Sequence, residues 1–87
     1  MDYKIKIKKT LITDNGKRFD IGDYIAFTLF NQNTKTREEY VGKIIDILND
    51  RIIIPIITVN KQFISGCYKE ILLSDIEPNS CSYVSYD

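Results

Sequence analysis

The 87-residue chain predicts a mainly β fold, a small barrel of five to six short strands with an added N-terminal hairpin and a possible short helix. Three observations carry this prediction. Apolar and polar residues alternate with a period of two along several stretches. Turn residues recur about every eight to twelve positions, and aromatic and β-branched residues dominate the runs between them.

The first element expected is a β-hairpin over residues 3–21. The segment DYKIKIKKTLI alternates apolar and polar residues, which is typical of a half-buried strand. Asn15 and Gly16 tolerate the positive φ that a tight hairpin turn requires. Phe19 and Ile21 resume the alternation on the returning strand.

The segment YIAFTLF, residues 24–30, is the next expected strand, because it is rich in aromatic and β-branched residues. Its odd positions Ile25, Phe27 and Leu29 share one face, which we expect to point into the core. The segment NQNTKTR that follows has no apolar residue and is expected to be an exposed loop.

Residues 37–49 fit two elements. Apolar residues recur there at helical spacing, at Tyr40, Val41, Ile44, Ile45 and Leu48. Thr36 and Glu39 also match a helix capping box. A glycine within a helix costs about 1 kcal/mol and the β-branched content is high, so we favour a strand bent at Gly42 and keep the helix as the alternative.

Asn49 and Asp50 separate two apolar runs and predict a hairpin turn, which makes IIIPIITV the next strand. We expect Ile45 and Ile53 to belong to the core. Pro55 has no N–H group, so this strand should have a free edge or a bulge there.

The C-terminal third predicts shorter elements. A loop over residues 60–66 with a short strand inside it leads to a strand over residues 71–73. Ser74 and Asp75 are expected to start a single helical turn that Pro78 closes. The tail SCSYVSYD is either a final edge strand or frayed.

Composition limits the classes of function. Residues 1–87 are expected to form one domain, and twelve basic residues balance twelve acidic ones. Binders of nucleic acid or anionic membranes usually carry a basic excess. The chain has no histidine, which removes the commonest general base and zinc ligand. We therefore expect no enzyme, no metal and no cofactor.

Export and membrane insertion are not expected. The N-terminus has no long apolar region, and charges and Pro55 interrupt the longest apolar run, GKIIDILNDRIIIPIITV. We therefore expect a cytoplasmic protein with reduced thiols. Cys67 is expected to be a small buried hydrophobe and Cys81 to lie in a polar tail, with a disulfide between them as the less favoured alternative. The richness in Ile, Lys, Asn, Tyr and Asp is typical of low-GC bacteria and their mobile elements.

The segments IGDYIAFTLF, YVGKIIDILNDRIIIPII and YKEILLSDIEP together resemble the layout of SH3-like small barrels of the Tudor and KOW type. In those folds Gly-Asp often opens the first strand, a glycine before alternating aliphatics marks the second, and a hydrophobic-x-x-Ser-Asp-Ile segment forms the last turn. The matching residues here are Gly22-Asp23, Gly42 and Leu73-Ser74-Asp75-Ile76. The resemblance covers about residues 20–78 and implies a module that binds peptides, nucleic acids or modified side chains, or docks on larger assemblies.

A row of lysines is the first candidate site. Lys4, Lys6 and Lys8 share one face of the expected first strand, and a spacing of about 6.8 Å per two residues suits a phosphate backbone. A solvated face whose lysines deter edge-to-edge pairing is the favoured alternative.

Tyrosines are the second candidate site. Tyr24 and Tyr40, with Tyr68, would form an aromatic cage if they converged. The favoured alternative is that they are ordinary amphipathic residues of strands.

We therefore expect a non-catalytic binding or adaptor module. A protein partner or self-association, for which the apolar strand over residues 52–59 is a candidate edge, is favoured over nucleic acid. No membrane and no small-molecule substrate are expected. The alternatives are a weak nucleic-acid-binding accessory protein, as of a bacterial mobile element, and a structural subunit of a homo-oligomer.

Overall fold

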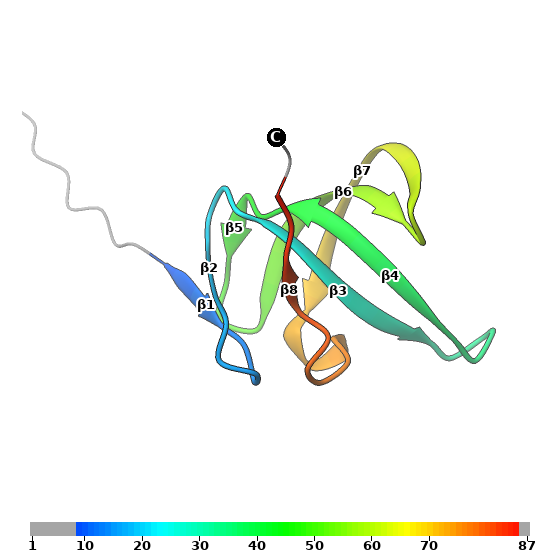
Figure 1. The fold of residues 1–87 in the computed structure, drawn as a ribbon, viewed down its shortest axis with the longest axis horizontal. Coiled ribbons are helices and arrows are strands. Elements are labelled where there is room, and N and C mark those ends of the chain that lie inside the picture. Colours follow the sequence, from blue (N-terminus) through cyan, green and yellow to red (C-terminus); the bar gives the residue numbers. More distant parts are fainter. Residues whose placement is uncertain (1–8, 86–87) are drawn as a thin grey trace, which may run out of the picture.

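The computed structural model describes residues 9–85 and is mainly β, which confirms the predicted fold class (Figure 1). The strands are β1 Thr10–Ile12, β2 Arg18–Asp20, β3 Tyr24–Asn31, β4 Thr36–Lys43, β5 Asp46–Ile47, β6 Arg51–Val59, β7 Gln62–Leu72 and β8 Ser82–Tyr83. A single 3-10 turn, η1 Leu73–Asp75, follows β7, so the short helical turn predicted at Ser74 and Asp75 is confirmed.

The strands form two antiparallel sheets. β1 and β2 make a two-stranded sheet, and the other six strands make one sheet in the order β5-β6-β4-β3-β8, with β7 on the opposite side of β6. β4 and β5 both pair with the same side of β6, because the chain bends between them. The large sheet curls into a half-barrel.

The described part of the predicted N-terminal hairpin is confirmed. Leu11 faces Phe19 across β1 and β2, and both side chains are buried. Gly16 has a φ of 80°, as the tight turn requires. Residues 3–8 of the predicted hairpin lie outside the described residues. The prediction was wrong for Ile21, which is exposed, because the strand ends at Asp20 and the chain turns away before β3.

Residues 36–43 form a strand and not a helix, so the favoured alternative is confirmed. The register between β4 and β6 shifts between Val41 and Gly42, which is the bend predicted at that glycine. The exposed loop before this strand is shorter than predicted, because Thr36 and Arg37 already pair with β3. The polar side chains of these two residues remain exposed on the strand.

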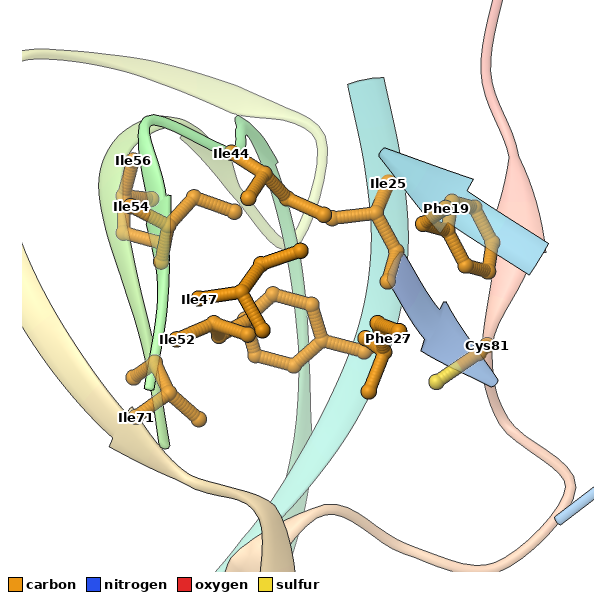
Figure 2. Packing of buried hydrophobic residues seen from close by; sticks show 11 residues of the cluster. Phe19, Ile25, Phe27, Ile44, Ile47, Ile52, Ile54, Ile56, Ile71 and Cys81 are labelled. Atoms are coloured by element: carbon orange, nitrogen blue, oxygen red, sulfur yellow. The ribbon is translucent and has the colours of Figure 1, made fainter. Parts of the chain in front are cut away.

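The core lies inside the half-barrel, where the buried side chains of several strands meet (Figure 2). Its members are Leu11, Phe19, Ile25, Phe27, Ile44, Ile47, Ile52, Ile54, Ile56, Ile71 and Cys81. The prediction that Ile45 and Ile53 belong to the core was wrong, since both are only half-buried. The hairpin places Ile52 opposite Ile47, and this register turns the even positions of β6 inward.

Pro55 lies on a central strand, so a fully free edge was the wrong expectation, whereas the predicted bulge occurs close by, between Ile56 and Thr58. The Ile53 carbonyl accepts a hydrogen bond from the Ile45 N–H on the β5 side of β6 (3.0 Å). Because backbone groups alternate along a strand, those of Pro55 point to the same side. No strand partner lies opposite Pro55 on that side, because β5 has ended and β4 begins one residue later. The missing N–H therefore leaves the ladder intact.

The loop predicted over residues 60–66 is a two-residue turn instead. Asn60 and Lys61 have φ values of 50° and 68°, and β7 begins directly after them at Gln62. Positive φ at both positions is the geometry of a type I′ hairpin turn. An Asn-Lys pair is a weaker signal for this turn than Asn-Gly, which is why the sequence did not reveal it.

The two cysteines are placed opposite to the prediction. Cys67 is exposed on β7, whereas Cys81 is 5% exposed within the core, and both are free thiols. Cys81 is buried because the tail returns along β3, where Thr28 N–H donates to Ser80 Oγ (3.1 Å) and β8 pairs with β3. The tail therefore forms the final edge strand, one of the two predicted alternatives.

Candidate protein-binding surface

The lysine row predicted as a phosphate site lies outside the described residues, at Lys4, Lys6 and Lys8. Lys9 is the first lysine that the structure describes. Its ammonium lies 3.5 Å from the Asp46 carboxylate, and both side chains are nearly half exposed. Such an exposed pair contributes little to stability.

Tyr24 and Tyr40 lie on opposite faces of the large sheet. Tyr40 faces the core residue Phe27 across β3 and β4, whereas Tyr24 faces Lys43 in the same register. Directly opposed residues share a face and successive residues alternate, so Tyr24 points away from the core. Tyr68 lies on β7, three strand spacings or about 14 Å from β3. The three tyrosines therefore form no shared cage.

Tyr40 belongs to a polar network on the inner face. Its hydroxyl donates to Glu38 Oε2 (3.0 Å), and Asn31 Nδ2 donates to Glu38 Oε1 (2.9 Å). These two hydrogen bonds, the Asn31 bond foremost, lower the pKa of Glu38, and burial together with Glu38 raises the pKa of Tyr40. The ring stacks on Phe27 at 5.8 Å, and the Lys69 ammonium lies 5.9 Å from its centroid. Tyr40 is thus held in place by its neighbours.

Apolar side chains also cover the outer face of β6 and β7. Ile53 and Pro55 alternate with the core residues of β6, and their register neighbours on β7 include Tyr68. We call Ile53, Pro55, Tyr68 and Leu72 the outer strip; none packs against the core cluster, and Tyr68 is 69% exposed. The solvent face of an antiparallel sheet is normally polar. An apolar outer face on a central strand is therefore typical of a surface that another chain covers.

The second part of this surface is the free edge of β7. Within residues 9–85, β7 pairs only with β6. Leu73 N–H donates to the Asp50 carbonyl (2.9 Å), so the backbone N–H and C=O groups of the odd-numbered residues of β7 point toward β6. The backbone N–H and C=O groups of Tyr68, Glu70 and Leu72 alternate with them and point away from the sheet. Such unpaired groups are a template for another strand.

The other long edge of the sheet is covered. β8 pairs with part of β3, and further along Glu77 N–H donates to the Thr28 carbonyl (2.9 Å). On β5, Ile47 N–H donates to the Asp46 carboxylate (2.9 Å), which occupies an edge donor. The contrast marks β7 as the edge that remains available to a partner.

The charged groups beside the outer strip are one cation and two carboxylates, a net charge of −1. Arg51 contacts the Asp50 carboxylate through Nε and Nη2 (2.9 and 3.1 Å), and its Nη1 lies 3.9 Å from Glu70. The Arg51 hydrogen bond lowers the pKa of Asp50. A single excess carboxylate gives only a weak preference for a basic partner, so apolar contact and backbone hydrogen bonds would dominate binding here.

The sequence interpretation missed the free edge at Tyr68, Glu70 and Leu72. It named Tyr68 only as a possible cage residue and placed Leu72 in a short strand over residues 71–73, because a loop was expected over residues 60–66. The outer strip, by contrast, could have been predicted from the sequence. In the run IIIPII both the odd-numbered and the even-numbered residues are apolar, whereas a strand needs only one of these two sets to fill the core of a half-barrel.

No group of three or more His, Cys, Asp or Glu side chains that could hold a metal occurs in residues 9–85. In the same part of the chain, no helix has the length and apolar character needed to cross a membrane. The fold and this surface define a small mainly β domain with a curled antiparallel sheet. No protein-family model, no curated protein and no solved structure matches the chain.

Proposed function

We propose that the chain is a non-catalytic protein-binding module that docks an extended segment of a partner along the free edge of β7. The observation that carries this proposal is the row of outward-pointing backbone groups at Tyr68, Glu70 and Leu72, directly beside the outer strip. A partner strand would add backbone hydrogen bonds at the edge, and its side chains would cover Tyr68 and Leu72.

The SH3-like resemblance supports the same function. The residues that carry the resemblance lie just before β3 (Gly22-Asp23), at the bend of β4 (Gly42) and at the turn after β7 (residues 73–76). Such barrels bind peptides, nucleic acids or modified side chains, or act as docking modules, and fold alone does not select between these roles. The exposed edge and its apolar neighbours favour a protein partner.

Two substitutions of Glu70 isolate the edge. Glu70→Pro removes an N–H that points away from β6, so the ladder within the sheet should survive. Glu70→Gln removes the same charge and keeps the N–H, which makes it the matched control. Spectroscopy should show both variants folded before any binding is measured.

Proteins captured from a lysate by the unmodified chain would be purified, and their binding to the three forms measured by calorimetry. We expect a purified partner to bind the Glu70→Pro variant about tenfold more weakly than the Glu70→Gln variant, since one edge hydrogen bond is lost and the proline ring stands where the added strand would lie. In the complex, hydrogen exchange should slow at the amides of Tyr68, Glu70 and Leu72. Equal affinity for both variants, or protection confined to other residues, would refute this docking surface.

A further inference from the structure

An apolar groove of about 320 Å³ lies between the β1–β2 hairpin and the segment that follows β7. Its apolar lining comes from both ends of the described chain: Leu11, Ile12, Leu73, Ile76, Pro78 and Cys81. A volume of this size is at the lower end of the range for ligand sites, about 300–1,000 Å³, and suits one large side chain of a partner.

Hydrogen bonds between the two walls hold the groove open. Asn79 N–H donates to both oxygens of the Asp14 carboxylate (3.2 and 3.0 Å), and Asn15 Nδ2 donates to the Cys81 carbonyl (3.3 Å). Leu11 and Cys81 are buried in the floor, while Ile12 is 65% exposed at the lip. The groove is thus formed before any partner binds, which lowers the entropic cost of binding.

The rim of the groove is acidic. Among the lining residues that the structure describes, the charged ones are Asp14 and Glu77. Glu77 is already paired with Arg37, whose Nε lies 2.6 Å from Glu77 Oε1. Asp14 accepts a backbone N–H but forms no ion pair with any described lysine or arginine. Within residues 9–85, the Asp14 carboxylate is therefore without an ion-pair partner beside an apolar floor. The Lys17 ammonium acts electrostatically on the same Cys81 thiol as Asp14, but it lies 5.8 Å from the centroid of the Tyr83 ring.

We propose that this groove is a second protein-binding site, which takes one apolar side chain of a partner segment that carries a Lys or Arg next to it. The apolar side chain covers Leu11, Ile12 and Ile76, and the cation meets Asp14. The charge of the rim selects a basic neighbour over an acidic one. This site shares no residue with the β7 edge, so the inference does not rest on the function proposed above. Two separate surfaces would let the chain join two partners.

Three peptides test whether the groove prefers a basic residue beside the apolar side chain: acetyl-Phe-Arg-amide, acetyl-Phe-Gln-amide and acetyl-Phe-Glu-amide. Each is titrated into the full chain, and the methyl resonances of Leu11, Ile12 and Ile76 are followed by NMR. We expect saturable shifts at these methyls, with the Arg peptide binding about two- to fivefold more tightly than the Gln peptide, as an exposed ion pair allows. The Glu peptide should bind most weakly.

Four variants separate the groove from the rest of the chain. Asp14→Asn keeps an acceptor for the Asn79 N–H and should remove the difference between the three peptides. Ile12→Lys places a cation at the exposed lip and should weaken binding of the Arg peptide. Glu39→Gln removes one exposed carboxylate elsewhere and should bind like the unmodified chain. Glu70→Pro should also leave peptide binding unchanged, which separates this site from the β7 edge.

Several results would overturn the proposal. These are the absence of saturable shifts, equal affinity for the three peptides, and shifts confined to residues outside the groove. A fourth is that the groove methyls shift with protein concentration in the absence of peptide, since that would make a second copy of the chain the occupant.

Discussion

Gly42 lies directly against Pro55. A β-carbon on Gly42 would stand 2.6 Å from the Pro55 carbonyl oxygen and 2.7 Å from Ile54 Cγ1. No side chain fits such a gap without movement of the backbone. β4 therefore approaches β6 as closely as it does because residue 42 has no side chain, and the bend of the half-barrel is located there.

The first prediction concerns this contact. We expect Gly42→Ala to lower the free energy of unfolding by about 1–3 kcal/mol, because the added methyl overpacks the junction of β4 and β6. Urea unfolding measures the loss. Gly16→Asn is the control, since Gly16 has open space around it and asparagine tolerates its φ of 80°. Equal losses for the two variants would show that the close approach is not the cause.

The second prediction concerns the isoleucine run. Ile54 is fully buried in the core, whereas its neighbour Ile53 is half-buried on the outer face. We expect Ile54→Ala to cost about 2–5 kcal/mol of unfolding free energy, as for other buried aliphatic side chains, and Ile53→Ala to cost clearly less. The pair has the same chemistry and adjacent positions. The opposite order in urea unfolding would mean that the assigned faces of β6 are reversed.

The third prediction concerns the acid range. Hydrogen bonds from Asn31 and Tyr40 hold the pKa of Glu38 below its ordinary value in the folded state. The ionised carboxylate therefore stabilises the fold above the unfolded-state pKa, and this contribution is lost as the pH falls through the folded-state pKa. Tyr40→Phe removes one donor, so the folded-state pKa of Glu38 should rise. The contribution of Glu38 to the loss of unfolding free energy at low pH should then become smaller.

An NMR titration of the side-chain carboxyl of Glu38 measures this change. Tyr68→Phe is the control, because Tyr68 is exposed on the opposite face and should leave the pKa of Glu38 unchanged. An unchanged pKa in the Tyr40→Phe variant would show that its hydroxyl does not stabilise the carboxylate.

The fourth prediction concerns the thiols. Burial, with Asp14 nearby, raises the pKa of Cys81, and the thiolate is the reactive form. Cys67 is exposed on β7. We expect one thiol to be alkylated rapidly in the native protein and the second only upon unfolding. In the Cys67→Ser variant the rapid phase should disappear, and its persistence would mean that Cys81 is accessible.

The fifth prediction concerns nucleic acid, the competing function. With no net charge, the chain should bind nucleic acid weakly at low salt and lose this binding at physiological salt. Substitution of Lys4, Lys6 and Lys8 by Gln should abolish the weak binding and change the free energy of unfolding by less than about 0.5 kcal/mol. Fluorescence titration with single- and double-stranded oligonucleotides measures both salt conditions.

A second triple variant controls for total charge. It replaces Lys35, Lys43 and Lys61 by Gln. Loss of binding in both variants would indicate a general charge effect, and tight binding by the unmodified chain at physiological salt would favour the nucleic-acid function over the protein-binding one.

Local features of the sequence were enough to predict most strands. The alternation through Ile25 and Phe27 predicted both a strand and its inner face, and Asn49-Asp50 predicted the hairpin that joins β5 to β6. Gly42 predicted the bend of β4. These features were readable because strand alternation and turn preferences depend on neighbours in the chain.

Contacts between segments that are distant in the sequence decided the features of the fold that the sequence did not predict. Cys81 is buried because Asn15 holds its carbonyl and the tail returns along β3, and nothing near residue 81 in the sequence indicates this. The sequence by itself determined that the chain forms a mainly β fold with an apolar central strand. Only the tertiary structure decided that Ile54 faces the core while Ile53 faces outward, that β7 keeps a free edge, and that the Leu11 and Cys81 segments enclose a groove. A shift of one residue in register reverses every side chain of a strand, and long-range pairing sets that register.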